Sequence, residues 1–228
     1  MARARGAEPF SWLGSISGLA LAAAIWAPPA VSWGAQVPLV AATLLAFIAA
    51  MARREGHASM LAATIETVFP LLYVALAGAH LIALRAIGPD VGRHLLFLLF
   101  FCVMFSDTAA YFFGRAFGKR PLAPKLSPKK SWEGAIAGML ASSGGAALAK
   151  IWFLPQLAWF DVVVLGLLLG AAGILGDLAE SMLKRASNVK DSSNLIPGHG
   201  GLLDRVDSLL FSAPVLFYYY DWVAGGVG

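Results

Sequence analysis

The sequence predicts an all-α fold, a polytopic integral membrane helical bundle of about seven transmembrane helices with its N-terminus in the cytoplasm. Three observations predict it. Of the 228 residues, 59% are hydrophobic and only 13% are charged, with a mean hydropathy of +0.73, which leaves too little polar side chain to cover a water-soluble globule. Apolar runs of roughly 17 to 24 residues recur, the length that crosses ~30 Å of hydrocarbon. The basic residues gather in the loops of one side.

The first span is predicted near residues 11–29, behind the basic Arg3 and Arg5. A secretory signal is the alternative, but the run is long and Trp12 and Trp26 are placed like interface residues, which favours a retained anchor. The apolar runs place the remaining spans near 35–52, 66–87, 94–116, 132–152, 160–183 and 206–224.

The basic residues orient these spans. With a cytoplasmic N-terminus, fourteen of the 17 lysines and arginines face the cytosol, and only Arg85, Arg93 and Lys150 face the other side. Loops 117–131 and 184–205 are therefore both cytosolic. We expect a multi-pass protein of the cell (inner) membrane with its active site facing the cytoplasm.

The chain is expected to form a single transmembrane catalytic domain over 1–228, with N-terminal helices in 1–93 and a catalytic core in 94–224. The net charge of +4 raises the possibility of nucleic-acid binding, but the cations sit in short loops between spans, so no nucleic-acid partner is expected. Cys102 is the single cysteine and excludes an intramolecular disulfide framework.

Two carboxylates lie deep in apolar runs. An unpaired Asp107 inside the fourth span costs on the order of 3 kcal/mol, so it must face a cavity or a partner. Tyr111 and Gly114 share its face, with Arg115 beside them. A structural hydrogen bond between helices is the alternative. Asp177 begins a stripe with Glu180, Ser181 and Lys184 at helical spacing. Snorkelling at a helix end explains the lysine but not an aspartate so deep in the run.

The loop after this stripe mixes carboxylates, cations and glycines, a combination suited to metal-bound phosphates. Asp204 and Asp207 open the last span on one face, although helix capping alone would explain one of them. The Pro197 to Gly201 stretch can approach an anion closely, while His199 alone fits either a loop hydrogen bond or a phosphate contact.

The other cytosolic loop is basic and stiffened by prolines, and Ser131 is placed to cap the fifth span. Anionic headgroups are the ordinary partner of such a segment. For Lys125 a headgroup and a substrate phosphate are equally compatible, whereas Lys129 and Lys130 lie at the helix mouth and favour substrate phosphate.

These residues resemble a known family. The pattern Ser181-x-Leu-Lys-Arg-x4-Lys-Asp-x-Ser-x2-Ile-Pro-x-His-Gly-Gly-Leu-x-Asp-Arg-Val-Asp207 is similar to the full signature of phosphatidate cytidylyltransferases, also called CDP-diacylglycerol synthases. Asp107 to Lys119 and Ser127 to Gly134 are also similar to that family, so the resemblance covers about 100–212.

The resemblance implies that CTP and phosphatidate give CDP-diacylglycerol and pyrophosphate, with Mg²⁺ as cofactor and a second cation compatible with the carboxylate set. It implies Asp177 and Asp204 as metal ligands, with Asp107 or Asp207 as additional ones. Catalytic roles are expected for Asp177, Asp204, Lys184, Arg205 and Asp207. Substrate binding is expected from Ser181, Arg185, Lys190, Asp191, His199, Gly200, Gly201, Lys129, Lys130, Ser131 and Lys119. The family also suggests a homodimer, which small residues such as those from Gly138 to Gly145 would permit.

Three alternatives remain. A CTP-dependent lipid kinase of the polyprenol or phytol type would use similar loops and release CDP. CDP-alcohol phosphotransferases are a weaker fit, because their Asp-Gly-x2-Ala-Arg motif is missing. A transporter or channel would place Asp107 and Asp177 along an ion path, but the loops of the outer side hold few polar residues to continue it.

Overall fold

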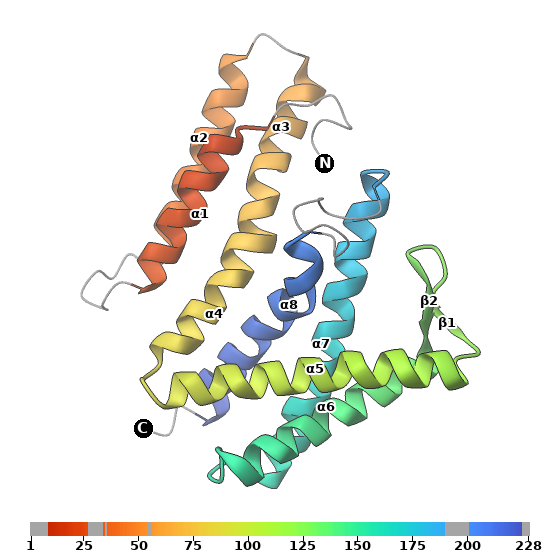
Figure 1. The fold of residues 1–228 in the computed structure, drawn as a ribbon. Helices are drawn as coiled ribbons and strands as arrows, with labels where there is room; N and C mark the ends of the chain where they lie inside the picture. The colour runs from red at the N-terminus through yellow and green to blue at the C-terminus, as the bar shows by residue number, and fades with distance from the viewer. Residues whose placement is uncertain (1–8, 27–33, 35, 54–55, 190–200, 225–228) are drawn as a thin grey trace. The chain divides into compact units, whose positions relative to one another are not determined.

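The computed structural model describes residues 9–26, 34, 36–53, 56–189 and 201–224, and they are almost entirely helical (Figure 1). The elements follow in the order α1 (Ser11–Trp26), α2 (Gln36–Ala52), α3 (His57–Pro70), the π-helical η2 (Leu71–Leu76), α4 (Ala77–Ala86), α5 (Val91–Phe117), β1 (Pro121–Ala123), β2 (Ser127–Ser131), α6 (Trp132–Trp152), α7 (Trp159–Ala186), α8 (Leu203–Tyr219) and the π-helical η3 (Tyr220–Ala224).

The prediction of an all-α membrane fold is confirmed. Within the described ranges, four helices are long and apolar enough to cross a membrane, namely His57–Ala86, Val91–Phe117, Trp132–Trp152 and Trp159–Ala186. The apolar helices α1 and α2 are shorter, with 16 and 17 residues. The described structure therefore supports several membrane spans without establishing the predicted count of seven.

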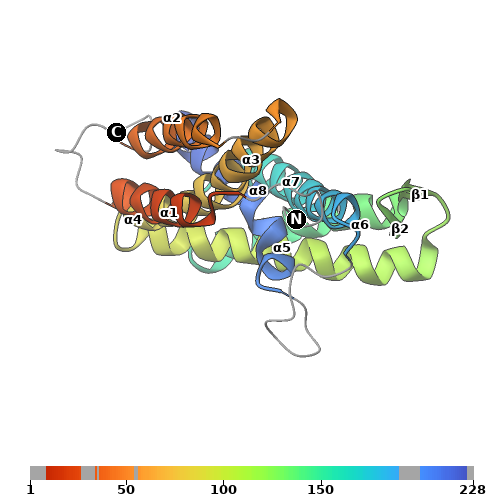
Figure 2. The same cartoon turned by 90° about the horizontal axis from the view of Figure 1, so that it is seen from above.

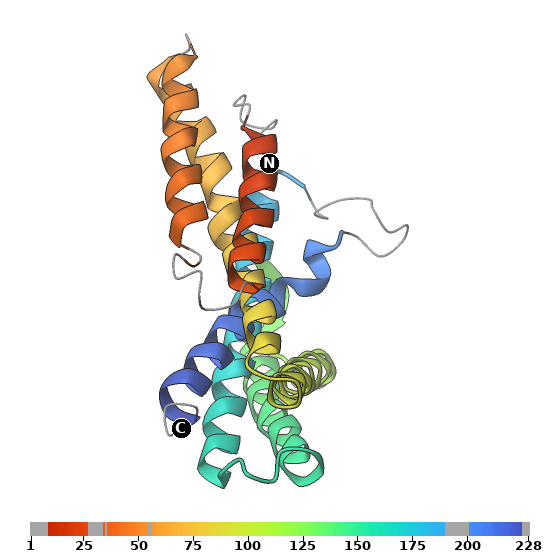
Figure 3. The ribbon, with the colours of Figure 1, turned by 90° about the vertical axis from the view of Figure 1, so that its left-hand side faces the viewer.

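The chain packs as two compact units, residues 1–86 and 87–228. In the N-terminal unit, α1 and α2 run alongside the continuous helix formed by α3, η2 and α4 (Figures 1 and 3). Small residues line this packing: Ala46, Ala50 and Ala63 are buried around Phe10 and Leu13. Small side chains allow apolar helices to approach closely, which stabilises their packing in lipid, where the hydrophobic effect does not drive helices together.

The helix from His57 to Ala86 starts nine residues before the predicted span at 66. Inside this helix, Thr64 and Thr67 donate their hydroxyls to the carbonyls of Met60 and Ala63, one turn back. These bonds satisfy the hydroxyls inside the helix, so the apolar run can extend. Pro70 lies within this helix and the wider π-helical turn η2 follows it, as expected where a proline removes a backbone donor.

The C-terminal unit stacks its helices in sequence order, α5 on α6, α6 on α7 and α7 on α8 (Figures 1 and 2). Glycines set the spacing of these helices. A Cβ on Gly166 would lie 2.2 Å from the Ser143 Cα of α6, and one on Gly176 would lie 2.4 Å from the Asp207 carbonyl oxygen of α8. Helix α7 is therefore held in close contact on both sides.

The small-residue face of α6 is used inside the chain. A Cβ on Gly138 would lie 3.0 Å from the Ser106 carbonyl oxygen, and one on Gly145 would lie 2.9 Å from that of Phe101, both on α5. Gly144 has no neighbouring atom within 4 Å at its Cβ position. The face expected to permit a dimer thus packs against α5 instead.

The loop predicted at 117–131 contains an antiparallel hairpin of β1 and β2, which pairs Pro121 with Ser131 and Ala123 with Ser127. It joins the end of α5 to the start of α6 (Figure 2). Ser131 caps α6 as predicted, since its Oγ accepts a hydrogen bond from the Gly134 amide at 3.2 Å. The hairpin therefore enters α6 through a fixed turn.

Candidate active site

Eight of the predicted site residues line a cavity of about 850 Å³ inside the C-terminal unit. It is bounded by α5, the hairpin, α6, α7 and α8. Its charged lining residues are Asp107, Arg115, Lys129, Lys130, Asp177, Glu180, Lys184, Asp204 and Asp207. Five carboxylates and four cations thus face a single space, although they come from four separate segments of the chain.

Asp177 is brought to this cavity by α7 and meets the hairpin there. Its Oδ2 forms an ion pair with the Nζ of Lys130, which lies in β2 just before α6. Its Oδ1 accepts a long hydrogen bond of 3.5 Å from Ser181, one turn further along α7. The Asp177 side chain is 38% exposed and remains accessible to a ligand.

Lys184 links α7 to α8. Its Nζ lies 2.5 Å from Glu180 Oε2, one turn back on α7, and 2.7 Å from Asp204 Oδ1, in the first turn of α8. Asp204 Oδ2 accepts a hydrogen bond of 2.8 Å from the Gly201 amide. Both oxygens of Asp204 are therefore held, and the carboxylate has one orientation.

Asp107 and Asp207 complete the carboxylate set. Asp207 lies in the second turn of α8 rather than at its start, and its Oδ1 accepts a hydrogen bond of 2.7 Å from the Ser208 amide. Its side chain is buried, and its charge and that of Asp107 both interact unfavourably with that of Asp177. Helix capping therefore does not account for Asp207. Three like charges around one space favour a bound cation.

The chemistry of these groups fits Mg²⁺. Carboxylate oxygens are its preferred protein ligands, and it usually keeps several waters and binds substrate phosphates rather than filling an all-protein cage. Among the described residues, no three His, Cys, Asp or Glu side chains converge closely enough to hold an ion by themselves. Asp177 and Asp204 each contact a lysine, and these lysines occupy positions next to the carboxylates where a cation would bind.

Some predicted residues lie outside the cavity lining. Lys119, Arg185 and Arg205 are exposed and do not line it. The Lys119 amide instead donates to Glu133 Oε2 at 3.1 Å, which fixes the start of the hairpin. The remaining predicted positions, Lys190, Asp191, His199 and Gly200, fall outside the described residues.

Sequence reasoning assigned no role to Glu180, although its side chain is only 2% exposed and lines the cavity. Its position, three residues after Asp177 and four before Lys184, places it on the same face of the helix as both, and this spacing was the sequence signal for a role in the site. Ser208, which also lines the cavity, carried no such signal because single serines are common near helix ends, whereas Ser127 lies in the stretch that resembles the family. Tyr111 and Arg115 line it as their spacing from Asp107 predicted, and Arg115 donates to the Tyr111 hydroxyl at 3.2 Å.

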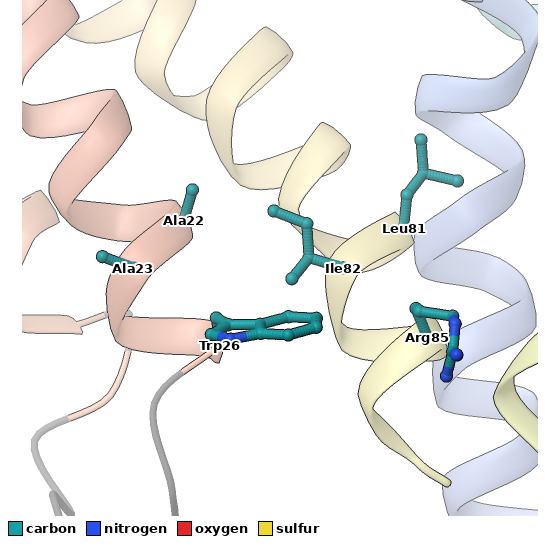
Figure 4. A pocket seen from close by; sticks show the side chains of 6 residues that line it. All are labelled: Ala22, Ala23, Trp26, Leu81, Ile82 and Arg85. Carbon is teal, nitrogen blue, oxygen red and sulfur yellow. The ribbon is translucent and has the colours of Figure 1, made fainter. Parts of the chain in front are cut away.

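A second cavity, of about 440 Å³, lies between α1 and α4 in the N-terminal unit (Figure 4). The Trp26 indole extends from the end of α1 toward Ile82 on α4, and Arg85 lies one turn beyond. The remaining lining residues in the described part of the chain are Ala22, Ala23 and Leu81. With no carboxylate in that lining, this cavity offers no comparable cation site.

Comparison with known proteins shows which family the sequence resembles. The sequence profile of the cytidylyltransferase family matches residues 1–223. A protein named phosphatidate cytidylyltransferase from Haemophilus influenzae is 49% identical over 140 residues, which cover 59% of this chain and 48% of that protein. A protein of the same name from Brucella suis is 45% identical over 65% of this chain and 54% of its own length. Another from Pseudomonas aeruginosa is 49% identical over 53% of this chain and 44% of its own length. The chain thus spans about half the length of the curated relatives it matches.

Proposed function

We propose, from the premise that this chain belongs to the cytidylyltransferase family, that it transfers the cytidylyl group of CTP to phosphatidate, forming CDP-diacylglycerol and pyrophosphate. The observation that carries the proposal is the single cavity that gathers Asp107, Asp177, Asp204 and Asp207 with Lys129, Lys130 and Lys184. Both substrates are phosphate esters, so a site that joins them must accept several negative charges together. Carboxylates for a cation and lysines for phosphate oxygens meet that requirement.

In this reaction a phosphate oxygen of phosphatidate attacks the α-phosphorus of CTP, and the bond from that phosphorus to the bridging oxygen of the β-phosphate breaks. Pyrophosphate leaves with the electron pair of that bond. The attacking phosphate is already ionised near neutral pH, so no side chain needs to remove a proton. The work left to the protein is in-line positioning and charge neutralisation.

Asp177 and Asp204 would hold Mg²⁺ from neighbouring helices, with Asp107 or Asp207 as further ligands and room for a second cation in the same carboxylate set. When bound, Mg²⁺ supplies charge neutralisation at the reacting phosphates. Gly201 supports this assignment, because its amide fixes the Asp204 carboxylate through one oxygen.

The cations would hold the phosphates. Lys129, Lys130 and Lys184 line the cavity, and each ammonium carries three donors for phosphate oxygens. Ser131, Ser181, Arg185 and Arg205 are proposed to act around them, together with Lys119. The same role is proposed for Lys190, Asp191, His199 and Gly200 of the intervening loop.

The setting follows from the same premise. We expect about seven spans, a cytoplasmic N-terminus and a site that faces the cytosol of the inner membrane, where CTP is available. A homodimer is proposed by analogy with the family, with an interface other than the Gly138 and Gly145 positions that pack on α5.

The deciding experiment incubates purified full-length protein with CTP, phosphatidate and Mg²⁺ and follows both phosphate products. Release of pyrophosphate with formation of CDP-diacylglycerol supports the proposal. Release of CDP with a phosphorylated lipid, when a polyprenol or phytol is supplied in place of phosphatidate, would instead identify a CTP-dependent lipid kinase. Ion flux into vesicles without CTP, combined with no nucleotide turnover, would identify a transporter or channel.

A further inference from the structure

Glu180 is a buried carboxylate in the middle of the cavity wall. The residue is 1% exposed, and its Oε1 has no hydrogen-bond partner among the described residues. Its Oε2 lies 2.5 Å from Lys184 Nζ. A buried carboxylate in an apolar helix is costly unless it is paired, and the side chain that Glu180 contacts is Lys184, so any effect of Glu180 on the site passes through that lysine.

Lys184 is shared between two carboxylates. Its ammonium contacts Glu180 on α7 and Asp204 on α8, at 2.5 and 2.7 Å. Two of its three donors are thereby directed at carboxylates, and one remains for a phosphate oxygen. Glu180, Lys184 and Asp204 form a chain of contacts that joins the two helices.

The charges of Glu180, Lys184 and Asp204 do not cancel. One ammonium stands between two carboxylates, so a negative charge is left over when both are ionised. Glu180 draws the ammonium toward α7 and therefore weakens its hold on Asp204. Without Glu180, Asp204 would be the one carboxylate in direct contact with Lys184, and an incoming cation would have to compete with that ion pair.

We infer that Glu180 is a positioning residue that holds Lys184 on α7 and so leaves Asp204 available to a divalent cation. The inference rests on the proposed function, in which Asp204 serves as a metal ligand. It adds a residue that touches neither substrate nor metal but sets the affinity of the site for the metal. Groups that orient metal ligands commonly change metal affinity or activity by about 10- to 100-fold when they are replaced.

The test measures binding of Mn²⁺ alone to the purified full-length protein in detergent, by electron paramagnetic resonance of the free ion. Glu180→Gln keeps the size of the side chain and removes its charge. We expect it to weaken Mn²⁺ binding by about 10- to 100-fold. In the assay with substrates, the Mg²⁺ concentration for half-maximal rate should rise by a similar factor, while the rate at saturating Mg²⁺ should change much less.

Two variants separate this role from a purely structural one. Glu180→Asp keeps the charge and should recover part of the Mn²⁺ affinity, and it also serves as the test if the Gln variant does not fold. Asp161→Asn makes the same chemical change at the other end of α7, where the carboxylate accepts from the Tyr219 hydroxyl at 2.6 Å. It should leave Mn²⁺ binding unchanged.

Wild-type affinity for Mn²⁺ in Glu180→Gln would overturn the inference, as would equal losses in Glu180→Gln and Glu180→Asp. Absence of Mn²⁺ binding to the wild-type protein would overturn it as well. The proposed function fails separately: a wild-type protein that binds Mn²⁺ but makes no CDP-diacylglycerol would reject that reaction, and the Mn²⁺ comparison would still decide the role of Glu180.

Discussion

The two units of this chain are built from similarly apolar helices but treat their polar side chains differently. In the N-terminal unit, several polar groups bond within their own helix: Thr43, Thr64 and His80 contact the carbonyls of Leu39, Met60 and Leu76, each four residues back. In the C-terminal unit, several also reach across helices. Lys184 joins α7 to α8, and the Ser212 hydroxyl of α8 lies 2.8 Å from the Ser208 carbonyl of its own helix and 3.2 Å from the Leu169 carbonyl of α7.

The cavities follow the same division. The cavity between α1 and α4 is lined by apolar side chains and Arg85, whereas the larger one is lined by nine charged residues. A polar residue in an apolar helix is thus not by itself a sign of function. Where a polar residue of the site has its partner on another helix, the activity of the site depends on how those two helices pack. Substitutions that change the packing or the partner test this dependence.

The largest effect is expected where the carboxylates meet the proposed cation. Asp177→Asn and Asp204→Asn should each lower the rate of CDP-diacylglycerol formation by about a thousandfold, because each removes a charge that neutralises the reacting phosphates, an effect of several kcal/mol. Both proteins should remain folded in the membrane, and chelation of Mg²⁺ should reproduce the loss in the wild type. Asp90→Asn is the control, since Asp90 pairs with Arg93 on the surface, and near-normal rates in either site variant would refute the metal assignment.

The next effect depends on helix spacing. Gly176→Ala places a Cβ 2.4 Å from the Asp207 carbonyl oxygen, too close for two atoms that are not bonded, so α7 and α8 must separate. We expect a loss of about 1–3 kcal/mol in stability and, because carboxylates on both helices shift, a loss of about 100-fold in rate.

Gly144→Ala makes the same change on α6 where the Cβ meets nothing within 4 Å. It should stabilise the protein by the ~0.5–1 kcal/mol by which alanine is favoured over glycine in a helix, and so raise the thermal midpoint in detergent slightly. If both variants unfold at the same temperature, the close contact of α7 with α8 does not stabilise the unit.

The hairpin lysines should divide into two groups. Lys130→Ala removes the ion pair with Asp177 and a cation from the cavity, so kcat/KM should fall at least about tenfold, in line with ~1.5–3 kcal/mol for a charged hydrogen bond. Lys129→Ala should mainly raise the apparent KM for the substrates. Lys125 is exposed and does not line the cavity, and Lys125→Ala should lower binding to anionic vesicles while kcat/KM stays within about twofold. Equal losses for Lys130 and Lys125 would contradict a separate role for the cavity.

The smallest effect compares two hydroxyls. Ser212→Ala removes the 2.8 Å bond to the Ser208 carbonyl within α8 together with the 3.2 Å bond to the Leu169 carbonyl of α7. It should cost about 1 kcal/mol, because a contact across helices is lost in addition to one within the helix. Thr43→Val removes a bond within α2 and should change stability by less than about 0.5 kcal/mol. Thermal unfolding in one detergent measures both, and a larger loss for Thr43→Val would reverse the distinction between the two units.

Sequence patterns were sufficient for features that depend on nearby residues. The spacing of Asp177, Ser181 and Lys184 put them on one face of α7, and the position of Ser131 before an apolar run predicted its cap on α6. The hairpin was not predicted, because Pro121 and Pro128 are unusual in strands and indicated a stiff loop. Pro121 is tolerated because it begins β1.

Contacts between distant segments were beyond these patterns. Nothing in the hairpin sequence says that Lys130 rather than Lys129 would meet Asp177, since that choice depends on the turn at Ser131 and on the packing of α6 against α7. The role of Glu180 was missed for the same reason. Its spacing placed it beside Lys184, but its burial becomes evident only when α7 and α8 are packed together.

The glycines of α7 make the length of that helix as important as its composition. Gly166 and Gly170 fit against α6, and Gly173 and Gly176 fit against α8, so the register of the helix is fixed on two sides before Asp177 is reached. Inserting or deleting one residue between Gly166 and Glu180 would rotate everything beyond it by about 100°. In homologous proteins, the equivalent helix should therefore vary in sequence on its lipid side yet keep this interval free of insertions and deletions. Differences in length should be confined to the segments outside α7.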